Sequence, residues 1–127
     1  MALHMIKLCV GVENVGELAE WQIKRAKERA KKGKSPNPFH DTRMTPKRAE
    51  EMLAGGSLYW VIKHYIIVRQ KLIGFEEVKD KDGKPKCRIH LDPELIRTRP
   101  RKKRPFQGWR YLEPGDAPAD LDGKGPA

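Results

Sequence analysis

The sequence predicts an α+β fold: a small, mostly antiparallel sheet or partly closed barrel, with two helices from the N-terminal half packed on one side. Two observations support this prediction. Helical periodicity with capping residues occurs before residue 55, whereas alternation of apolar and polar residues dominates from residue 57 onward. The later strands also follow one another without intervening helices, which favours hairpins over a parallel doubly wound sheet.

The first part of the chain predicts a strand and a long helix. Residues 5–10 are rich in Ile, Leu and Val and are expected to form the strand. Asn14 and Glu17 have the spacing of a capping box, so the helix is expected to follow Asn14 and to end near residue 32, before Gly33. Its apolar stripe is expected to comprise Val15, Ala19, Ile23, Ala26 and Ala30, with Leu18 and Trp21 beside it.

A loop and a second helix are expected next. Residues 35–41 contain two prolines and are expected to form the loop. Thr45 is expected to cap a short helix, because Pro46 follows it at the helical position where proline is favoured. Gly55 and Gly56 are expected to end this helix.

From residue 57 the sequence predicts strands. Residues 57–63 are expected to place Leu58, Trp60 and Ile62 on one face and Tyr59, Val61 and Lys63 on the other. Residues 64–80 predict one long bent strand or two short ones, with Gly74 at a bulge or bend.

A hairpin and a closing strand complete the predicted sheet. Asp82 and Gly83 form a strong hairpin-turn signal. Residues 85–92 are expected to form the return strand, with Cys87, Ile89 and Leu91 facing inward. A single helical turn is expected over residues 92–96, and the last strand over residues 108–112.

The length of 127 residues predicts one domain, residues 1–113, followed by a disordered acidic tail, residues 114–127. The formal net charge is +10. All but one of the 27 Lys and Arg residues, and all but four of the 17 Asp and Glu residues, lie in residues 1–112, which therefore carry +13. This excess predicts an anionic partner, with nucleic acid the first candidate.

Several other classes of function receive little support. No apolar run approaches the roughly 20 residues of a membrane span, and the first residues do not resemble a signal peptide. We therefore expect a cytoplasmic protein with no membrane contact and two reduced cysteines. Cys87 with His90, and His4 with Cys9, lie at odd separations on predicted strands, which send the side chains of each pair to opposite faces. No metal, cofactor or catalytic set is predicted.

Residues 97–104, RTRPRKKR, hold six cations; we call them the basic segment. Pro100 and Pro105 are expected to keep the segment extended, as an exposed loop whose cations bind phosphates. In the strand that follows, the rings of Trp109 and Tyr111 are expected to serve the core first and a nucleic-acid base second. The predicted function is nucleic-acid binding, with RNA preferred over DNA.

The candidate binding residues come from the basic segment and two strands. Tyr65, Arg69 and Lys71 are expected to share one strand face, where a ring beside a guanidinium group can hold a base or phosphate. The full set comprises Arg97, Arg99, Arg101, Lys102, Lys103, Arg104, Arg110, Arg69, Lys71 and Tyr65. Residues 24–34 form a second basic stretch, and the sequence leaves open whether the two stretches share a face.

Two alternative functions remain open. The first is a small enzyme acting on nucleic-acid bases or phosphodiesters, with Lys63, Tyr65 and Arg69 near a pocket and His64 as the candidate base. The second is a basic adaptor for a ribosomal, polymerase or other acidic protein partner. The oligomeric state, and whether the acidic tail folds back onto the basic segment, are also left open.

Six motifs resemble a known family. "HMIKLCVG", "TRMTPKRAEEML", "GGSLYWVIK", "VRQKLIGFE", "LDPELIRTRP" and "RPFQGWRYL", in this order, resemble an alphaproteobacterial family of domains of unknown function. The resemblance covers residues 1 to about 118 and implies a bacterial origin without implying an activity.

A more distant resemblance is to the PUA, ASCH and EVE group of small β-barrel domains. It rests on "SLYWVIK" followed by "IIVRQKLIGFEEV". This resemblance implies a PUA-like barrel that binds RNA or modified bases beside the barrel. Some ASCH-like members are hydrolases or nucleases, but none of their catalytic residues matches a position in this chain.

Overall fold

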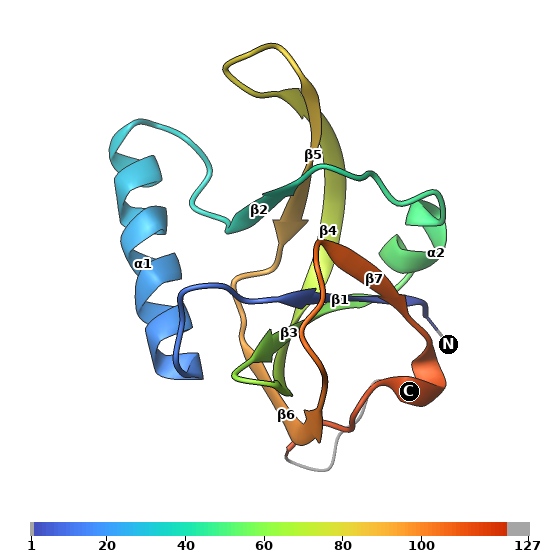
Figure 1. The fold of residues 1–127 in the computed structure, drawn as a ribbon. Coiled ribbons are helices and arrows are strands. Elements are labelled where there is room, and N and C mark those ends of the chain that lie inside the picture. The colour runs from blue at the N-terminus through green and yellow to red at the C-terminus, as the bar shows by residue number, and fades with distance from the viewer. Residues whose placement is uncertain (1, 122–127) are drawn as a thin grey trace.

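The computed structural model describes residues 2–121, which form an α+β arrangement of two α-helices and seven strands (Figure 1). The predicted α+β class is therefore confirmed. In chain order the elements are β1 (His4–Leu8), α1 (Val15–Lys31), β2 (Phe39–Thr42), α2 (Ala49–Leu53), β3 (Ser57–Ile62), β4 (Tyr65–Lys79), β5 (Pro85–Leu91), β6 (Ile96–Lys102) and β7 (Trp109–Leu112). A short 3-10 helix, η1 (Pro114–Asp116), follows β7. No helix within residues 2–121 is long and apolar enough to cross a membrane.

The strands form one open, mostly antiparallel sheet in the order β2-β5-β4-β3-β1-β7. The pair β1–β3 is parallel, and the other neighbours are antiparallel. The long strand β4 pairs with β3 and β6 over its first half and with β5 over its second half. The register with β5 shifts between Leu72 and Gly74, which confirms the irregularity expected at Gly74.

Strand β3 is buried on both faces and separates two core clusters. Leu58, Trp60 and Ile62 belong to the first cluster, to which the helices contribute Leu18 and Met52. Tyr59 and Val61 belong to the second cluster, which the C-terminal part of the chain covers. The alternation expected over residues 57–62 is confirmed, and both helices pack on the same side of the sheet.

Helix α1 begins as the sequence predicts but buries a different face. Asn14 Oδ1 accepts a hydrogen bond from Glu17 N at 2.9 Å, and the helix ends before Gly33, whose φ is +72°. The expected apolar stripe was only partly right: Val15 packs against the first core cluster, but the fully buried residues are Leu18 and Gln22, and Ile23 is 56% exposed. An apolar pattern does not find Gln22, because this residue is polar and is buried through a hydrogen bond.

Three local expectations were wrong. Residues 39–42, partly expected in a loop, form β2, because β5 supplies a partner strand. Thr45 does not cap α2, which begins at Ala49 after Arg48. Residues 92–96 form no helical turn; Asp92 Oδ1 accepts from Glu94 N at 2.9 Å and closes a tight turn between β5 and β6.

The expectation of a disordered tail from residue 114 was wrong for residues 114–121. Residues 114–116 form η1, and Asp120 bridges to Thr98 of β6. Asp120 is only 5% exposed because its side chain neutralises the buried Arg69. The remainder of the predicted tail, residues 122–127, lies outside the described residues.

Candidate functional site

The basic segment, expected as an exposed loop, forms a strand over most of its length. Its residues up to Lys102 belong to β6 and pair with β4, so the expected loop is a strand there, although its backbone is extended as expected. Pro100 fits because the pairing register shifts between Ile66 and Val68, where a missing backbone donor is tolerated. All six cations of the segment are exposed.

The positive charges of the basic segment are not neutralised by acidic side chains of the described residues. Within residues 2–121, none of its cations lies within ion-pair distance of an Asp or Glu. Arg101 Nη1 donates to the backbone oxygen of Asp116 at 2.7 Å. The segment therefore presents an excess of positive charge to the solvent, and such an excess attracts anions.

Strand pairing in β6 and β7 places the cations that were predicted to bind on both faces of the sheet. Arg101 and Arg110 pair with isoleucines of the second core cluster, whereas Arg97 pairs with a valine of the first cluster. Paired residues on neighbouring strands point to the same face. The cations predicted from the sequence therefore do not form a single surface.

Arg69 and Lys71 share a face of β4, as expected, because they pair with Tyr59 and Ser57, but Tyr65 does not lie on that face, so the expectation was wrong for Tyr65. Tyr65 pairs with Ile62 of the first cluster, whereas Arg69 pairs with Tyr59 of the second. The irregular register within this part of β4 shifts the alternation. Arg69 is also only 8% exposed, so it is held within the fold, whereas Lys71 is exposed.

The residues of the enzyme alternative are also separated. Lys63 and His64 form the turn between β3 and β4, with φ values of +49° and +71°. Lys63 makes an exposed ion pair with Glu13. Arg69 lies buried on the other side of the sheet from Tyr65, so these groups do not converge on one pocket.

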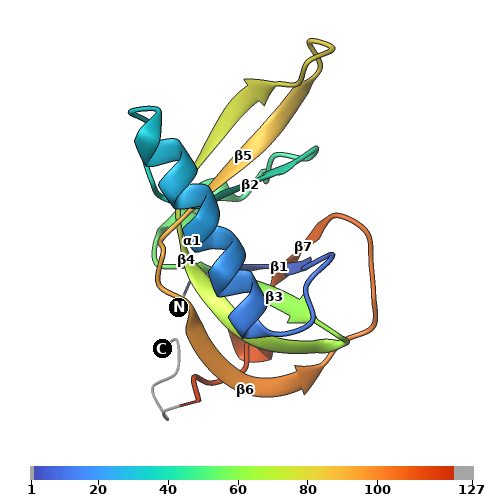
Figure 2. The same cartoon turned by 90° about the vertical axis from the view of Figure 1, so that its left-hand side faces the viewer.

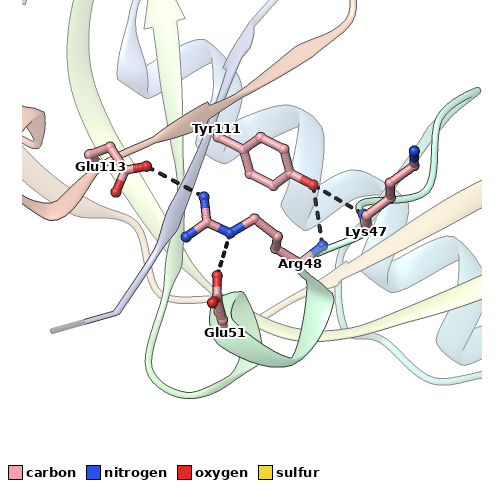
Figure 3. A network of polar contacts seen from close by, with 5 residues as sticks. All are labelled: Lys47, Arg48, Glu51, Tyr111 and Glu113. Carbon is pink, nitrogen blue, oxygen red and sulfur yellow. Dashed lines mark hydrogen bonds and ion pairs between the residues drawn. The ribbon is translucent and has the colours of Figure 1, made fainter.

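The rings that follow the basic segment hold another part of the chain. Tyr111 Oη accepts from Lys47 N at 3.0 Å and from Arg48 N at 3.2 Å, just before α2 (Figure 3). Trp109 Nε1 donates to the backbone oxygen of Met44 at 2.7 Å. Arg48 also forms ion pairs with two glutamates, shown in Figure 3. Both rings therefore have structural roles. Trp109 packs partly buried against the first core cluster, as expected, whereas Tyr111 is 37% exposed, so the expectation that its ring serves the core was wrong.

A cavity lies elsewhere and is lined mainly by residues of α1, of β1 with the loop after it, and of β2. Figure 2 shows α1 covering this side of the sheet. The volume of the cavity is about 450 Å³. Four aromatic side chains line it: Trp21, Phe39, His40 and Trp60. We call it the aromatic cavity. Rings on several sides of a cavity this size favour a flat, unsaturated ligand.

Three titratable groups on the wall of the aromatic cavity are shifted by their surroundings. Burial lowers the pKa of Lys7, and the neighbouring Cys9 partly opposes that shift. Burial, with a smaller effect of Lys7, lowers the pKa of His40 to about 4. Burial raises the pKa of Cys9 to about 11. At neutral pH the imidazole and the thiol are therefore uncharged.

A buried amide pair fixes one wall of the aromatic cavity. Gln22 and Gln70 exchange two hydrogen bonds of 2.9 Å between α1 and β4. Gln70 Oε1 also accepts from Trp60 Nε1 at 2.8 Å, and its Nε2 donates to the backbone oxygen of Asp92 at 3.0 Å. These bonds set the orientation of the Trp60 ring, against which His40 packs edge-to-face at 5.3 Å.

Arginines stack on the outer rings of the aromatic cavity. Arg25 lies over Trp21 at 4.9 Å from the ring centroid. Arg29 and Arg88 lie over Phe39 at 5.0 Å and 4.1 Å. A cation over an aromatic ring is attracted by the negative face of the ring. Arg88 is neutralised by Asp41 and Arg29 donates to three backbone oxygens, so Arg25 is the arginine of this group that combines uncompensated positive charge with an aromatic ring.

The sequence does not identify this site, although some of its residues carry a signal. Trp21, expected beside a buried helix stripe, is 45% exposed. Phe39 and His40 are expected in a proline-rich loop, where neither residue stands out. Lys7 is the single Lys or Arg in the otherwise mainly apolar strand β1, and this is the signal by which the sequence could have identified it. No group of three or more His, Cys, Asp or Glu side chains in the described part of the chain is arranged to hold a metal ion.

Comparison with known proteins identifies a family but no activity. No curated protein and no solved structure matches the chain. A family model described as "Protein of unknown function (DUF1489)" matches residues 5–127. This agrees with the resemblance found in the sequence motifs. The chain belongs to the DUF1489 family.

Proposed function

We propose that this protein binds single-stranded nucleic acid, RNA in preference to DNA, and that the aromatic cavity receives one unstacked base. The observation that carries the proposal is a cavity of about 450 Å³ lined by four aromatic side chains and rimmed by arginines. Sequence-specific RNA recognition commonly holds splayed-out bases between aromatic or guanidinium groups. The distant resemblance to PUA, ASCH and EVE domains points the same way.

The size and chemistry of the aromatic cavity suit a base. Small-molecule sites occupy about 300–1,000 Å³, and this cavity lies within that range. Uncharged His40 adds a flat ring and hydrogen-bonding nitrogens without adding charge. Stacking on an aromatic side chain contributes about 1–3 kcal/mol per base in single-strand binding proteins.

The second half of α1 supplies positive charge beside the aromatic cavity. Its cations are Lys24, Arg25, Lys27, Arg29 and Lys31, with Lys32 and Lys34 just beyond the helix. None of these side chains forms an ion pair with Asp or Glu anywhere in residues 2–121. Arg29 already donates to backbone oxygens of residues 35–37, so Arg25 and the lysines are the groups that can hold the phosphates of a strand whose base enters the cavity.

The basic segment provides a second contact at the other end of α1. Figure 2 shows β6 near the N-terminal end of α1, whereas the C-terminal end of the helix lies toward β2 and β5. The first half of α1 and its lead-in carry the acids Glu13, Glu17 and Glu20. The two basic stretches are therefore separate contacts for one strand rather than one continuous surface.

The test is a titration of fluorescently labelled single-stranded RNA, followed by anisotropy. Trp21→Ala should weaken binding by about tenfold or more, because it removes one stacking surface. Ile23→Ala is the matched control, since Ile23 is exposed on the same helix and does not line the aromatic cavity. Equal affinities for the wild type and Trp21→Ala, or binding unaffected by salt, would contradict the proposal.

The alternative of a small enzyme acting on nucleic-acid bases has one specific observation in its favour. Lys7 and His40 line the same cavity, and burial favours the uncharged, basic form of both side chains. A general base needs this form within reach of its substrate. Incubation of the protein with nucleosides and oligonucleotides, analysed by chromatography, should reveal turnover that Lys7→Met or His40→Gln abolishes. Turnover that survives both changes would remove this alternative.

A further inference from the structure

Lys7 is the unusual residue of the aromatic cavity. It lies on β1, where it pairs with Trp60 of β3 on one side and with Trp109 of β7 on the other. Its side chain lines the cavity and is only partly exposed. Its ammonium group has no Asp or Glu within ion-pair distance among residues 2–121.

The other groups on the wall do not neutralise this charge. His40 and Cys9 are uncharged at neutral pH. Glu17 lines the aromatic cavity from the first turn of α1, but among residues 2–121 no ion pair joins its carboxylate to Lys7. A partly buried ammonium without an acceptor is unfavourable. A ligand with hydrogen-bond acceptors next to the Lys7 ammonium group should therefore bind more tightly than one with donors there.

We infer that Lys7 makes the aromatic cavity selective for guanine, by donating hydrogen bonds to the O6 and N7 edge of the inserted base. This inference rests on the proposed function and names the base that the same site accepts. Lysine donating to guanine O6 and N7 is among the common base-specific contacts of proteins. Adenine presents an amino group where guanine presents O6, and that group opposes the ammonium.

The cavity also contains an acceptor for the opposite edge of guanine. Lys7 comes from β1 and Glu17 from α1; Glu17 Oε1 accepts from Glu13 N at 2.8 Å, and its second oxygen, Oε2, is left to accept from the N1 and N2 donors of guanine. Guanine has acceptors on its O6 and N7 edge and donors at N1 and N2. Adenine lacks the N1 and N2 donors, so it is disfavoured on both walls.

The experiment compares uridine oligonucleotides that differ in one central base. The oligonucleotide with a central guanine should bind at least about tenfold more tightly than the one with adenine. A good bidentate contact discriminates against the wrong base by about 1–3 kcal/mol. Substitution of 7-deazaguanine should remove part of that preference, because it lacks N7, and inosine should reveal the contribution of the N2 amino group. These comparisons use the unchanged protein, so they do not depend on how a variant folds.

Two variants connect the preference to the side chain. Lys7→Met should bring guanine and adenine to similar affinity, whereas Lys81→Met, at an exposed lysine of the β4–β5 turn outside the aromatic cavity, should leave the preference intact. Lys7→Arg retains donors and should retain part of the preference. A thermal melt of each variant checks that it is folded.

The outcomes distinguish the role of Lys7 from the proposed function. Tight RNA binding that depends on Trp21 but does not distinguish guanine from adenine would overturn the role of Lys7 and leave the proposed function standing. A guanine preference unchanged in Lys7→Met would also overturn it. No binding of any oligonucleotide would overturn both the inference and the proposed function.

Discussion

Arg69 and Asp120 lie 51 positions apart in the chain and form a two-point ion pair inside the fold. Arg69 Nε donates to one Asp120 oxygen and Nη2 to the other, each at 2.9 Å. The remaining nitrogen, Nη1, donates to Ser57 Oγ at 2.8 Å. The hydrogen bonds with Asp120 raise the pKa of Arg69. The pair attaches the segment after η1 to the sheet.

Loss of the Asp120 carboxylate should destabilise the protein strongly. Asp120→Ala leaves the Arg69 guanidinium buried without its counter-charge, and removal of one partner from a buried pair costs about 3–5 kcal/mol. Asp116→Ala is the matched control, because Asp116 is exposed on η1 and its hydrogen bonds within residues 2–121 come from the backbone alone. Urea unfolding followed by circular dichroism measures the free energy of unfolding of both variants. Equal losses in the two variants would show that the ion pair contributes little to stability.

The sequence could not reveal this pair. Local composition places Arg69 on a binding surface and Asp120 in a disordered tail, because it judges each residue by its near neighbours. A contact across 51 positions leaves no local pattern. The same limit applies to Gln22, whose partner Gln70 lies 48 positions away.

Stability should fall on mild acidification because His4 is buried uncharged. His4 is 2% exposed, its Nδ1 accepts from Ser57 N at 3.0 Å, and burial, with the charge of Arg69, lowers its pKa from 6.5 to about 4. The unfolded chain therefore takes up a proton from about pH 6.5 downward, whereas the folded protein does so only near pH 4. The stabilisation is complete above pH 6.5 and is lost as the pH falls through this window.

The expected loss from His4 is about 3 kcal/mol across the window, at about 1.4 kcal/mol for each pKa unit. His4→Asn should flatten the fall in unfolding free energy between pH 6.5 and 4, since asparagine can accept from Ser57 N but does not titrate. His64→Asn, at an exposed histidine of the β3–β4 turn, controls for removal of one histidine. If the unfolding free energy of His4→Asn depended on pH as steeply as that of the wild type, the prediction would be contradicted.

Tyr111→Phe should lower stability without lowering RNA affinity. The change removes the acceptor for the backbone N–H groups of Lys47 and Arg48, and each hydrogen bond contributes about 0.5–1.5 kcal/mol. The ring itself remains, so any stacking on a base would also remain. Tyr65→Phe is the control, because no hydrogen bond from the Tyr65 hydroxyl occurs within residues 2–121. Weaker RNA binding by Tyr111→Phe at equal stability would assign its hydroxyl to a ligand.

The features predicted correctly from the sequence are those that depend on near neighbours. The Asn14 cap, the irregularity at Gly74 and the hairpin turn at Gly83 each follow from the conformational preference of one or two residues. The β2 strand and the aromatic cavity depend instead on which distant segment supplies a partner. Phe39 becomes a strand residue because His90 of β5 lies opposite it.

The Gln22–Gln70 pair should behave as a coupled unit. Gln70→Leu leaves the Trp60 Nε1–H and the Gln22 amide without partners in the core, at about 1–3 kcal/mol for each unsatisfied group. Gln22→Leu is expected to cost less, because Gln70 keeps its bonds to Trp60 and Asp92. The double variant should cost less than the sum of the singles, because both amides are then absent. Losses that simply sum in urea unfolding would show that the amides act independently.

Neutralising the two basic stretches should weaken RNA binding unequally. Lys24, Lys27 and Lys31 lie on the helix that borders the aromatic cavity, so their replacement by Gln should reduce affinity more than replacement of an equal number in the basic segment. For single strands the dependence of log affinity on log salt falls by about 0.7 for each phosphate that a variant no longer neutralises. Titrations over a range of salt concentrations therefore measure how many phosphates each variant binds.

In the basic segment, the three residues to be replaced by Gln are Arg99, Lys102 and Lys103. Arg101 is kept, so its hydrogen bond to Asp116 stays in place. If one RNA strand contacts both basic stretches, each triple variant should reduce the slope of log affinity against log salt. For oligonucleotides too short to reach β6, only the triple variant in α1 should change that slope. The triple variant in the basic segment would then alter only the binding of longer strands. A slope that changes with the triple variant in the basic segment and not with the one in α1 would place the main phosphate contacts away from the aromatic cavity, because counterion release registers contacts wherever they occur.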